Sequence, residues 1–149
     1  MDGERRCSFP ASLSGVPVAD TSPSHSAARR RAKVLVIDDE PSLGRCIARS
    51  LRQHDVALLS DGRAGLARLC EGTLPDLVLC DLMMPGCTGM DLYQELARCR
   101  PEALQRLVFM TGGSYTSACD RFLAQHSVSV IIKPFENGAL DALVARSLS

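Results

Sequence analysis

The chain has 149 residues, 46% of them hydrophobic and only 4% aromatic, and its 17 basic and 17 acidic side chains leave no net charge. This length and composition predict a single domain with an aliphatic core, and the balanced charge excludes a general electrostatic attraction to nucleic acid. No apolar run approaches the ~18 residues of a membrane span and no secretory signal is visible at the N-terminus, so we expect a cytoplasmic protein without nucleic-acid or membrane partners.

Residues 1–32 differ in composition from the rest of the chain. They contain Pro10, Pro17 and Pro23 and show no periodic apolar pattern, which predicts a disordered N-terminal tail. We interpret the basic cluster at 29–31 as part of a solvated linker. The alternative, that it contacts a docking partner or nucleic acid, stays open. We expect deletion of 1–32 to change the free energy of unfolding by no more than about 1 kcal/mol.

Beyond the tail, short apolar runs alternate with amphipathic segments. Strands are predicted at 33–38, 56–60, 76–81, 106–111 and 128–132, and helices at 41–53, 63–71, 88–99, 115–126 and 137–147. Pro41 suits the first turn of the first helix, and Thr88 with Asp91 predicts a capping box at the start of the third. Asp61 with Gly62 is interpreted as an ordinary turn. The alternation predicts an α/β fold with a parallel sheet and helices on both faces.

Seven cysteines are spread irregularly over the chain. No two of them form a Cys-x-x-Cys pair, so neither a zinc site nor a redox motif is expected. Cys46, Cys80 and Cys99 fall within apolar patterns and are predicted to be small core side chains. In a cytosolic protein, we expect the cysteines to be reduced thiols.

Polar side chains stand at the ends of four of the predicted strands. Asp38 and Asp39 follow the first strand, Asp81 ends the third, Thr111 ends the fourth and Lys133 follows the fifth. Because the carboxyl ends of parallel strands meet at one edge of a sheet, where such sheets bind ligands, we expect these side chains to converge. Three carboxylates would repel one another there without a cation, which predicts an acidic metal-binding pocket.

Four short motifs resemble those of the receiver domain of two-component response regulators. They are, in chain order, Ile37-Asp38-Asp39-Glu40-Pro41, Asp81-Leu82-Met83-Met84-Pro85-Gly86-Cys87-Thr88-Gly89, Phe109-Met110-Thr111-Gly112 and Ile132-Lys133-Pro134-Phe135. The resemblance covers residues 33–149 and is to single-domain, chemotaxis-regulator-like receivers, with some similarity to the terminal receivers of hybrid histidine kinases. It implies a flavodoxin-like, doubly wound parallel sheet with strand order 2-1-3-4-5.

The resemblance also implies roles for the acidic residues. Asp81 would be the phospho-acceptor, whose carboxylate takes a phosphoryl group and forms an aspartyl phosphate. Mg²⁺ would be held directly by Asp39, Asp81 and the backbone carbonyl of Met83, and through a water molecule by Asp38. The plainer alternatives are a turn or helix-capping aspartate at 81 and a helix N-terminus at 38–39.

The resemblance implies that two further residues belong to the pocket. Thr111 would supply a hydroxyl that moves toward the phosphoryl group, and Lys133 an ammonium that pairs with one of its oxygens. Without the resemblance, a lysine after an apolar strand is equally consistent with a side chain that points into solvent. The family has a cis peptide bond before Pro134, which would aim Lys133 into the pocket.

The chain departs from the family pattern at two places. Val130 stands where the family usually has an aromatic side chain that rotates inward on phosphorylation, and a β-branched residue does not repeat that motion. Gly112 and Gly113 follow Thr111 where alanine and a variable side chain are usual, which predicts a looser loop. We therefore expect Thr111 and the loop after it to carry the signal without an aromatic lock.

Together these residues predict a phospho-accepting module of a two-component phosphorelay and not an enzyme that turns over a free substrate. A histidine kinase or histidine phosphotransfer protein would donate the phosphoryl group, and an unknown downstream protein would bind the changed surface, since no DNA-binding domain follows the last helix.

One alternative is a pseudo-receiver that binds partners without phosphorylation. Another is a haloacid-dehalogenase-like phosphatase, which needs Asp-x-Asp where this chain has Asp38-Asp39-Glu40. No glycine-rich loop follows the first strand, which excludes a nucleotide-binding dehydrogenase.

Overall fold

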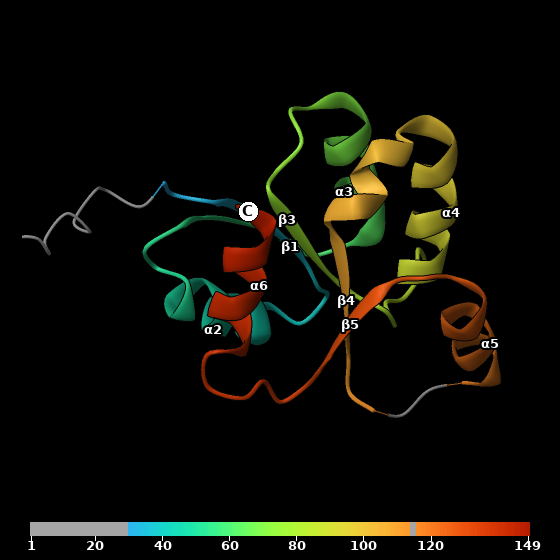
Figure 1. Cartoon of the computed structure of the whole chain (residues 1–149). Helices are drawn as coiled ribbons and strands as arrows, with labels where there is room; N and C mark the ends of the chain where they lie inside the picture. The colour runs from blue at the N-terminus through green and yellow to red at the C-terminus, as the bar shows by residue number, and fades with distance from the viewer. Residues whose placement is uncertain (1–29, 114–115) are drawn as a thin grey trace, which may run out of the picture. The chain divides into compact units, whose positions relative to one another are not determined.

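The computed structural model describes residues 30–113 and 116–149, and in it a central sheet carries helices on both faces (Figure 1). The strands are β1 (Lys33–Ile37), β2 (Asp55–Leu59), β3 (Leu77–Asp81), β4 (Leu107–Thr111) and β5 (Ser129–Ile132). They lie in the order β2-β1-β3-β4-β5, and every pair of neighbours is parallel. The expected flavodoxin-like order 2-1-3-4-5 is confirmed.

The helices divide between the two faces of the sheet. They are α2 (Pro41–Ser50), α3 (Gly62–Glu71), α4 (Gly89–Cys99), α5 (Ser117–Gln125) and α6 (Ala139–Ser147), with a 3₁₀ helix, η3 (Pro101–Arg106), before β4. Helices α2 and α6 cover one face, and α3, α4 and α5 cover the other (Figure 1). Among the residues that the structure describes, no helix combines the length and the apolar character that a membrane crossing needs.

The alternation of side chains along the strands produces two core clusters, one on each face. On β1, Leu35 and Ile37 join the cluster beneath α3, α4 and α5, whereas Val34 and Val36 join the cluster beneath α2 and α6. The central strands β3 and β4 are buried at every residue. Continuous apolar runs therefore identified these strands, because a parallel strand covered on both faces has no polar side.

The starts of three helices can be compared with the predictions made from the sequence. Pro41 lies in the first turn of α2, and the capping box of α4 is confirmed, since Thr88 Oγ1 accepts a hydrogen bond from the Asp91 N–H at 3.1 Å while the Asp91 carboxylate accepts one from the Thr88 N–H at 3.0 Å. The interpretation of Asp61 as part of an ordinary turn was wrong. Its carboxylate caps α3 by accepting from the Ala64 N–H at 2.8 Å, and aspartate favours both settings.

Most of the predicted tail lies outside the described residues, but two of its last residues contact the domain. Arg31 Nη2 lies 2.8 Å from Asp55 Oδ1. Ala32 is completely buried, its N–H donates to His54 Nδ1, and its carbonyl accepts from the Asp55 N–H. The compact unit accordingly begins at Arg31, two residues before the start that the composition indicated.

Two truncations of the N-terminus are expected to differ in stability. A chain that begins at Arg31 keeps the Ala32 contacts, so its free energy of unfolding should lie within about 1 kcal/mol of that of the full chain. A chain that begins at Lys33 also loses the hydrogen bonds of Ala32 to His54 and Asp55, which should cost a further ~1 kcal/mol. The structure thus raises the loss expected for deletion of 1–32 above the value that composition alone suggested. Urea denaturation of the three chains measures both differences. Equal stability of the two truncated chains would show that Ala32 contributes nothing.

The cysteines differ from their predicted state. Cys70 and Cys99 form a disulfide bond, with Cα atoms 6.2 Å apart, so the expectation of reduced thiols was wrong for this pair. Cys46 is exposed, and of the three predicted core thiols only Cys80 is a buried free cysteine. Sequence spacing gave no sign of the pairing because 29 residues separate the two partners and only the packing of α3 against α4 brings them together.

Candidate functional site

The first pair of acidic residues follows β1 directly. The Asp38 N–H donates to the Leu59 carbonyl at 3.0 Å, which continues the pairing of β1 with β2 by one residue. The Asp38 carboxylate accepts from the Glu40 N–H at 2.8 Å, and α2 begins at the next residue. Asp38 is therefore buried, at 4% exposed, whereas Asp39 is open to solvent.

Asp81 ends the central strand β3, with β1 on one side and β4 on the other. It is only 8% exposed, and its carboxylate accepts from the Met83 N–H at 3.3 Å. The chain then turns toward α4, where the Gly89 N–H donates to the Leu82 carbonyl at 3.0 Å. A Cβ atom at Gly89 would lie 2.9 Å from the Asp81 carbonyl oxygen, so this close approach requires glycine.

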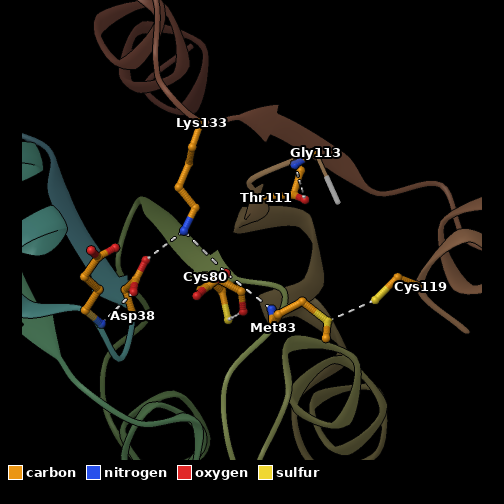
Figure 2. Close-up of polar contacts among 9 residues, drawn as sticks. Asp38, Cys80, Met83, Thr111, Gly113, Cys119 and Lys133 are labelled. Carbon is orange, nitrogen blue, oxygen red and sulfur yellow. Dashed lines mark hydrogen bonds and ion pairs between the residues drawn. The ribbon is translucent and has the colours of Figure 1, made fainter. Parts of the chain in front are cut away.

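Three aspartates and one lysine converge at this edge of the sheet. One carboxylate oxygen from each of Asp38, Asp39 and Asp81 lies within 4.8 Å of the other two. Lys133 Nζ is 3.4 Å from Asp38 Oδ2 and 3.6 Å from Asp81 Oδ1, and Figure 2 shows its side chain reaching toward Asp38. The lysine thus points into the pocket and not into solvent, and the peptide bond between it and Pro134 is cis.

The pocket is short of positive charge. Burial raises the pKa of Asp81 above its ordinary value, and the neighbouring Asp38 carboxylate raises this pKa further. The Lys133 ammonium and the Met83 N–H lower the same pKa because both stabilise the carboxylate. Among the described residues, Lys133 is the one cationic side chain that forms an ion pair with these aspartates. An added cation would relieve the remaining repulsion.

The oxygen atoms of the pocket suit Mg²⁺. This ion takes oxygen ligands at about 2.1 Å and keeps several water molecules, so two ligands on one ion are at most ~4.2 Å apart. One oxygen from each of the three carboxylates lies within 4.8 Å of the others, which is close enough for one ion with water in part of its coordination shell to bind all three. Met83, on the loop that follows Asp81, is 42% exposed, and its backbone carbonyl is a further candidate ligand.

Thr111 ends β4 beside this cluster. Its side chain is buried, and its Oγ1 accepts from the Gly113 N–H at 3.3 Å. Its carbonyl accepts from the Lys133 N–H at 2.7 Å, so the backbone links these two site residues. Gly113 has a φ of 89°, which residues other than glycine rarely adopt. Apart from chain neighbours, no atom of the described residues lies within 4 Å of the position that a Cβ at Gly112 or Gly113 would take.

Val130 lies on β5, where its register partner on β4 is Phe109. It is 38% exposed, and Ile132 on the same strand is 59% exposed. The position that carries an aromatic side chain in the family is thus taken here by a short aliphatic residue at the surface. Together Val130 and Ile132 leave apolar side chains uncovered on this edge strand.

A contact between two sulfur atoms beside the site was not predicted. Met83 Sδ lies 3.2 Å from Cys119 Sγ, which connects the loop after Asp81 to the first turn of α5 (Figure 2). Burial strongly raises the thiol pKa of Cys80, so this thiol stays protonated at neutral pH and does not compete with Asp81 as a nucleophile. The sequence gives no sign of the contact between Met83 and Cys119, since 36 residues separate them.

Removing one carboxylate from the pocket is expected to stabilise the metal-free domain. With EDTA present, Asp81→Asn should gain on the order of 1 kcal/mol in free energy of unfolding, because one of three clustered negative charges disappears. Mg²⁺ should stabilise the wild type more than the variant, since binding to the native state adds to its stability. Urea denaturation with EDTA or Mg²⁺ measures both effects. Asp55→Asn, an exposed aspartate outside the pocket, is the control; lower stability of Asp81→Asn in EDTA would contradict net repulsion.

Comparison with proteins of known sequence adds independent information. A family model, the response regulator receiver domain, matches residues 34–145. The DNA-binding response regulator MtrA of Mycolicibacterium smegmatis is 34% identical over 120 residues, which are 79% of this chain and 51% of MtrA. Nodulation protein W of Bradyrhizobium diazoefficiens is 30% identical over 125 residues, which are 81% of this chain and 53% of that protein. The chain spans about half the length of these relatives.

Solved structures share the fold. A response regulator receiver domain protein from Clostridium thermocellum aligns with a TM-score of 0.64 and 26% identity, covering 78% of this chain and 94% of that one. Vibrio cholerae chemotaxis protein CheY4 aligns with a TM-score of 0.65 and 23% identity, covering 79% of this chain and 99% of that one. The sheet and helices described above therefore correspond to nearly the whole of these two proteins.

Proposed function

The chain belongs to the family of response regulator receiver domains, and on this basis we propose that it is a phospho-accepting module of a two-component phosphorelay, with Asp81 as the acceptor. The observation that supports this most is the environment of Asp81. A buried carboxylate ends the central strand, two more carboxylates lie within 4.8 Å of it, and Lys133 Nζ lies 3.6 Å away. A turn or capping aspartate needs neither a cluster of acids nor a lysine.

The proposed reaction is transfer of a phosphoryl group from a histidine side chain of a histidine kinase or a histidine phosphotransfer protein. A carboxylate oxygen of Asp81 attacks the phosphorus atom, and the phosphorus–nitrogen bond of the donor breaks. The bonding electron pair stays on the imidazole nitrogen. The product on this chain is an aspartyl phosphate, so the domain takes part in its own modification without turning over a free substrate.

The other pocket residues serve this reaction. Asp39, Asp81 and the Met83 carbonyl would hold Mg²⁺ directly and Asp38 through water, and the bound ion would offset charge on the transferring group. Lys133 already lies between two carboxylates and is placed to pair with a phosphoryl oxygen.

Thr111 is proposed to respond to the phosphoryl group. Its hydroxyl would give up the hydrogen bond from Gly113 and donate to a phosphoryl oxygen. The two glycines that follow Thr111 have no side chains to restrain the backbone beside it, which favours this movement. The loop after Thr111 would then carry the change to α5, in place of an aromatic rotation at Val130.

The product of phosphorylation is proposed to be a changed surface that an unknown downstream protein binds. The surface lies on α5, β5 and α6, where Val130 and Ile132 are already exposed. MtrA is described as DNA-binding, but the match covers only 51% of its length, and we propose no contact with nucleic acid for this domain. We place the protein in the cytoplasm, which cell fractionation would test.

Intact mass spectrometry tests the proposal. The full chain is incubated with acetyl phosphate and Mg²⁺, and a single phosphoryl adduct is expected. EDTA should prevent the adduct, because the carboxylate cluster would then keep its charge uncompensated. A folded chain that forms no adduct with this donor, or with a phosphorylated histidine phosphotransfer protein, would favour a pseudo-receiver that binds its partners constitutively.

A further inference from the structure

The disulfide bond between Cys70 and Cys99 lies away from the phosphorylation pocket. Both cysteines are in the last turns of their helices, α3 (62–71) and α4 (89–99). In a parallel α/β sheet the helices run opposite to the strands, so their C-terminal ends lie near the sheet edge remote from Asp81. Helix α4 alone puts about 15 Å between Cys99 and the loop that follows Asp81. The bond is therefore not a component of the acidic site.

The disulfide is open to attack by external thiols. Cys99 is an exposed residue and Cys70 is half-buried, so the pair lies at the surface of the domain, where external thiols have access to it. By contrast, Cys80 and Cys119 are buried. Of the described free cysteines, Cys46 is exposed, but it lies on α2, on the other face of the sheet.

A guanidinium group connects the two helix ends that carry the pair. Arg100 immediately follows Cys99, and its Nη1 donates to the carbonyls of Leu69 and Gly72, which flank Cys70 closely in sequence. A positive charge near a thiol favours the thiolate, the form that attacks disulfides. The Arg100 Nε also donates to Glu102 at 3.2 Å, so this charge is partly compensated. These hydrogen bonds also connect the end of α4 to the end of α3.

We propose that Cys70 and Cys99 form a reversible thiol–disulfide site that responds to small disulfide oxidants of the glutathione class. The thiolate of one cysteine attacks oxidised glutathione and releases one reduced glutathione. The second cysteine thiolate then attacks the mixed disulfide and releases another. The pair loses two electrons and two protons, and the oxidant gains both. In a reducing compartment, disulfides of this kind are mostly transient and redox-sensing.

The redox state determines how firmly α3 and α4 are held together. The closed ring of residues 70–99 contains β3, Asp81 and all of α4. Cross-linking a loop of this length reduces the freedom of the unfolded chain and stabilises the folded one, so oxidation should raise the melting temperature by about 10 °C. The rise in melting temperature does not require phosphorylation, so its test is independent of the role proposed for Asp81.

Peptide mapping tests the chemistry directly. The full chain is equilibrated with oxidised or with reduced glutathione, unfolded, alkylated with iodoacetamide and digested. A peptide joined through Cys70 and Cys99 is expected after oxidation, and both cysteines should be alkylated after reduction. The proposal is overturned if the joined peptide does not form in oxidised glutathione, or if it persists unchanged in reduced glutathione.

Thermal unfolding of matched variants tests the consequence. The wild type should melt about 10 °C higher in oxidised than in reduced glutathione. Cys70→Ser and Cys99→Ser should lose this difference, and Cys46→Ser should keep it because that thiol is unpaired. A difference that survives in Cys70→Ser would mean that another pair of cysteines is responsible. The wild type is measured in both oxidised and reduced glutathione, so the effect of the disulfide on its melting temperature is determined even if a variant folds poorly.

Discussion

Replacing Asp81 with asparagine is expected to abolish the phosphoryl adduct that the wild type forms with acetyl phosphate and Mg²⁺. The amide has no carboxylate oxygen to attack the phosphorus atom, so the loss should be complete within detection and not a modest reduction in rate. The variant should remain folded, since the substitution keeps the shape of a residue that is only 8% exposed and removes charge repulsion from the pocket. Intact mass spectrometry beside the wild type measures the loss.

Two aspartate-to-asparagine variants serve as comparisons for that loss. Asp55 is exposed and paired with Arg31, so Asp55→Asn should form the adduct as the wild type does. Asp39→Asn keeps the acceptor but weakens the proposed Mg²⁺ site, so its adduct should decrease and recover at higher Mg²⁺ concentration. A full adduct on Asp81→Asn would mean that another residue, such as Asp38 or Asp39, accepts the phosphoryl group.

Replacing Phe109 with alanine is expected to produce the largest loss of stability, about 3–5 kcal/mol in the free energy of unfolding. Phe109 is completely buried and packs against two other rings, with its centroid 5.8 Å from that of Phe122 and 6.4 Å from that of Tyr93. Its ring would also lie 2.9 Å from a Cβ at Gly89, where α4 begins. Truncation leaves a cavity beneath the loop that follows Asp81. Because domains of this size are stable by only about 5–15 kcal/mol, much of the total is lost.

Val130→Ala is the matched control for Phe109→Ala. The two residues are register partners on β4 and β5, but Val130 is 38% exposed, so its truncation should cost less than about 1 kcal/mol. Urea denaturation followed by circular dichroism measures both. If Phe109→Ala cost no more than Val130→Ala, the aromatic cluster would not be the centre of this core.

The element order and the fold class could be read from the sequence because they depend on local periodicity. Central strands such as 77–81 and 107–111 are buried at every residue and leave continuous apolar runs, and the helices between them carry caps such as Thr88. The convergence of Asp38, Asp81 and Lys133 was also predictable, since parallel strands bring their carboxyl ends to one edge. The roles assigned to these residues came from the resemblance of four motifs to a known family.

The structure alone decided the contacts that join distant parts of the chain. The sulfur atoms of Met83 and Cys119 meet because α5 packs beside the loop after β3, and Cys70 bonds to Cys99 because α3 and α4 end side by side. Ala32 belongs to the core cluster that contains Val34 and Val36, and its carbonyl accepts a hydrogen bond from the Asp55 N–H at the start of β2. Local patterns report which side of a segment is apolar; they do not report how neighbouring helices are placed on the sheet, and that placement determines which of their side chains touch.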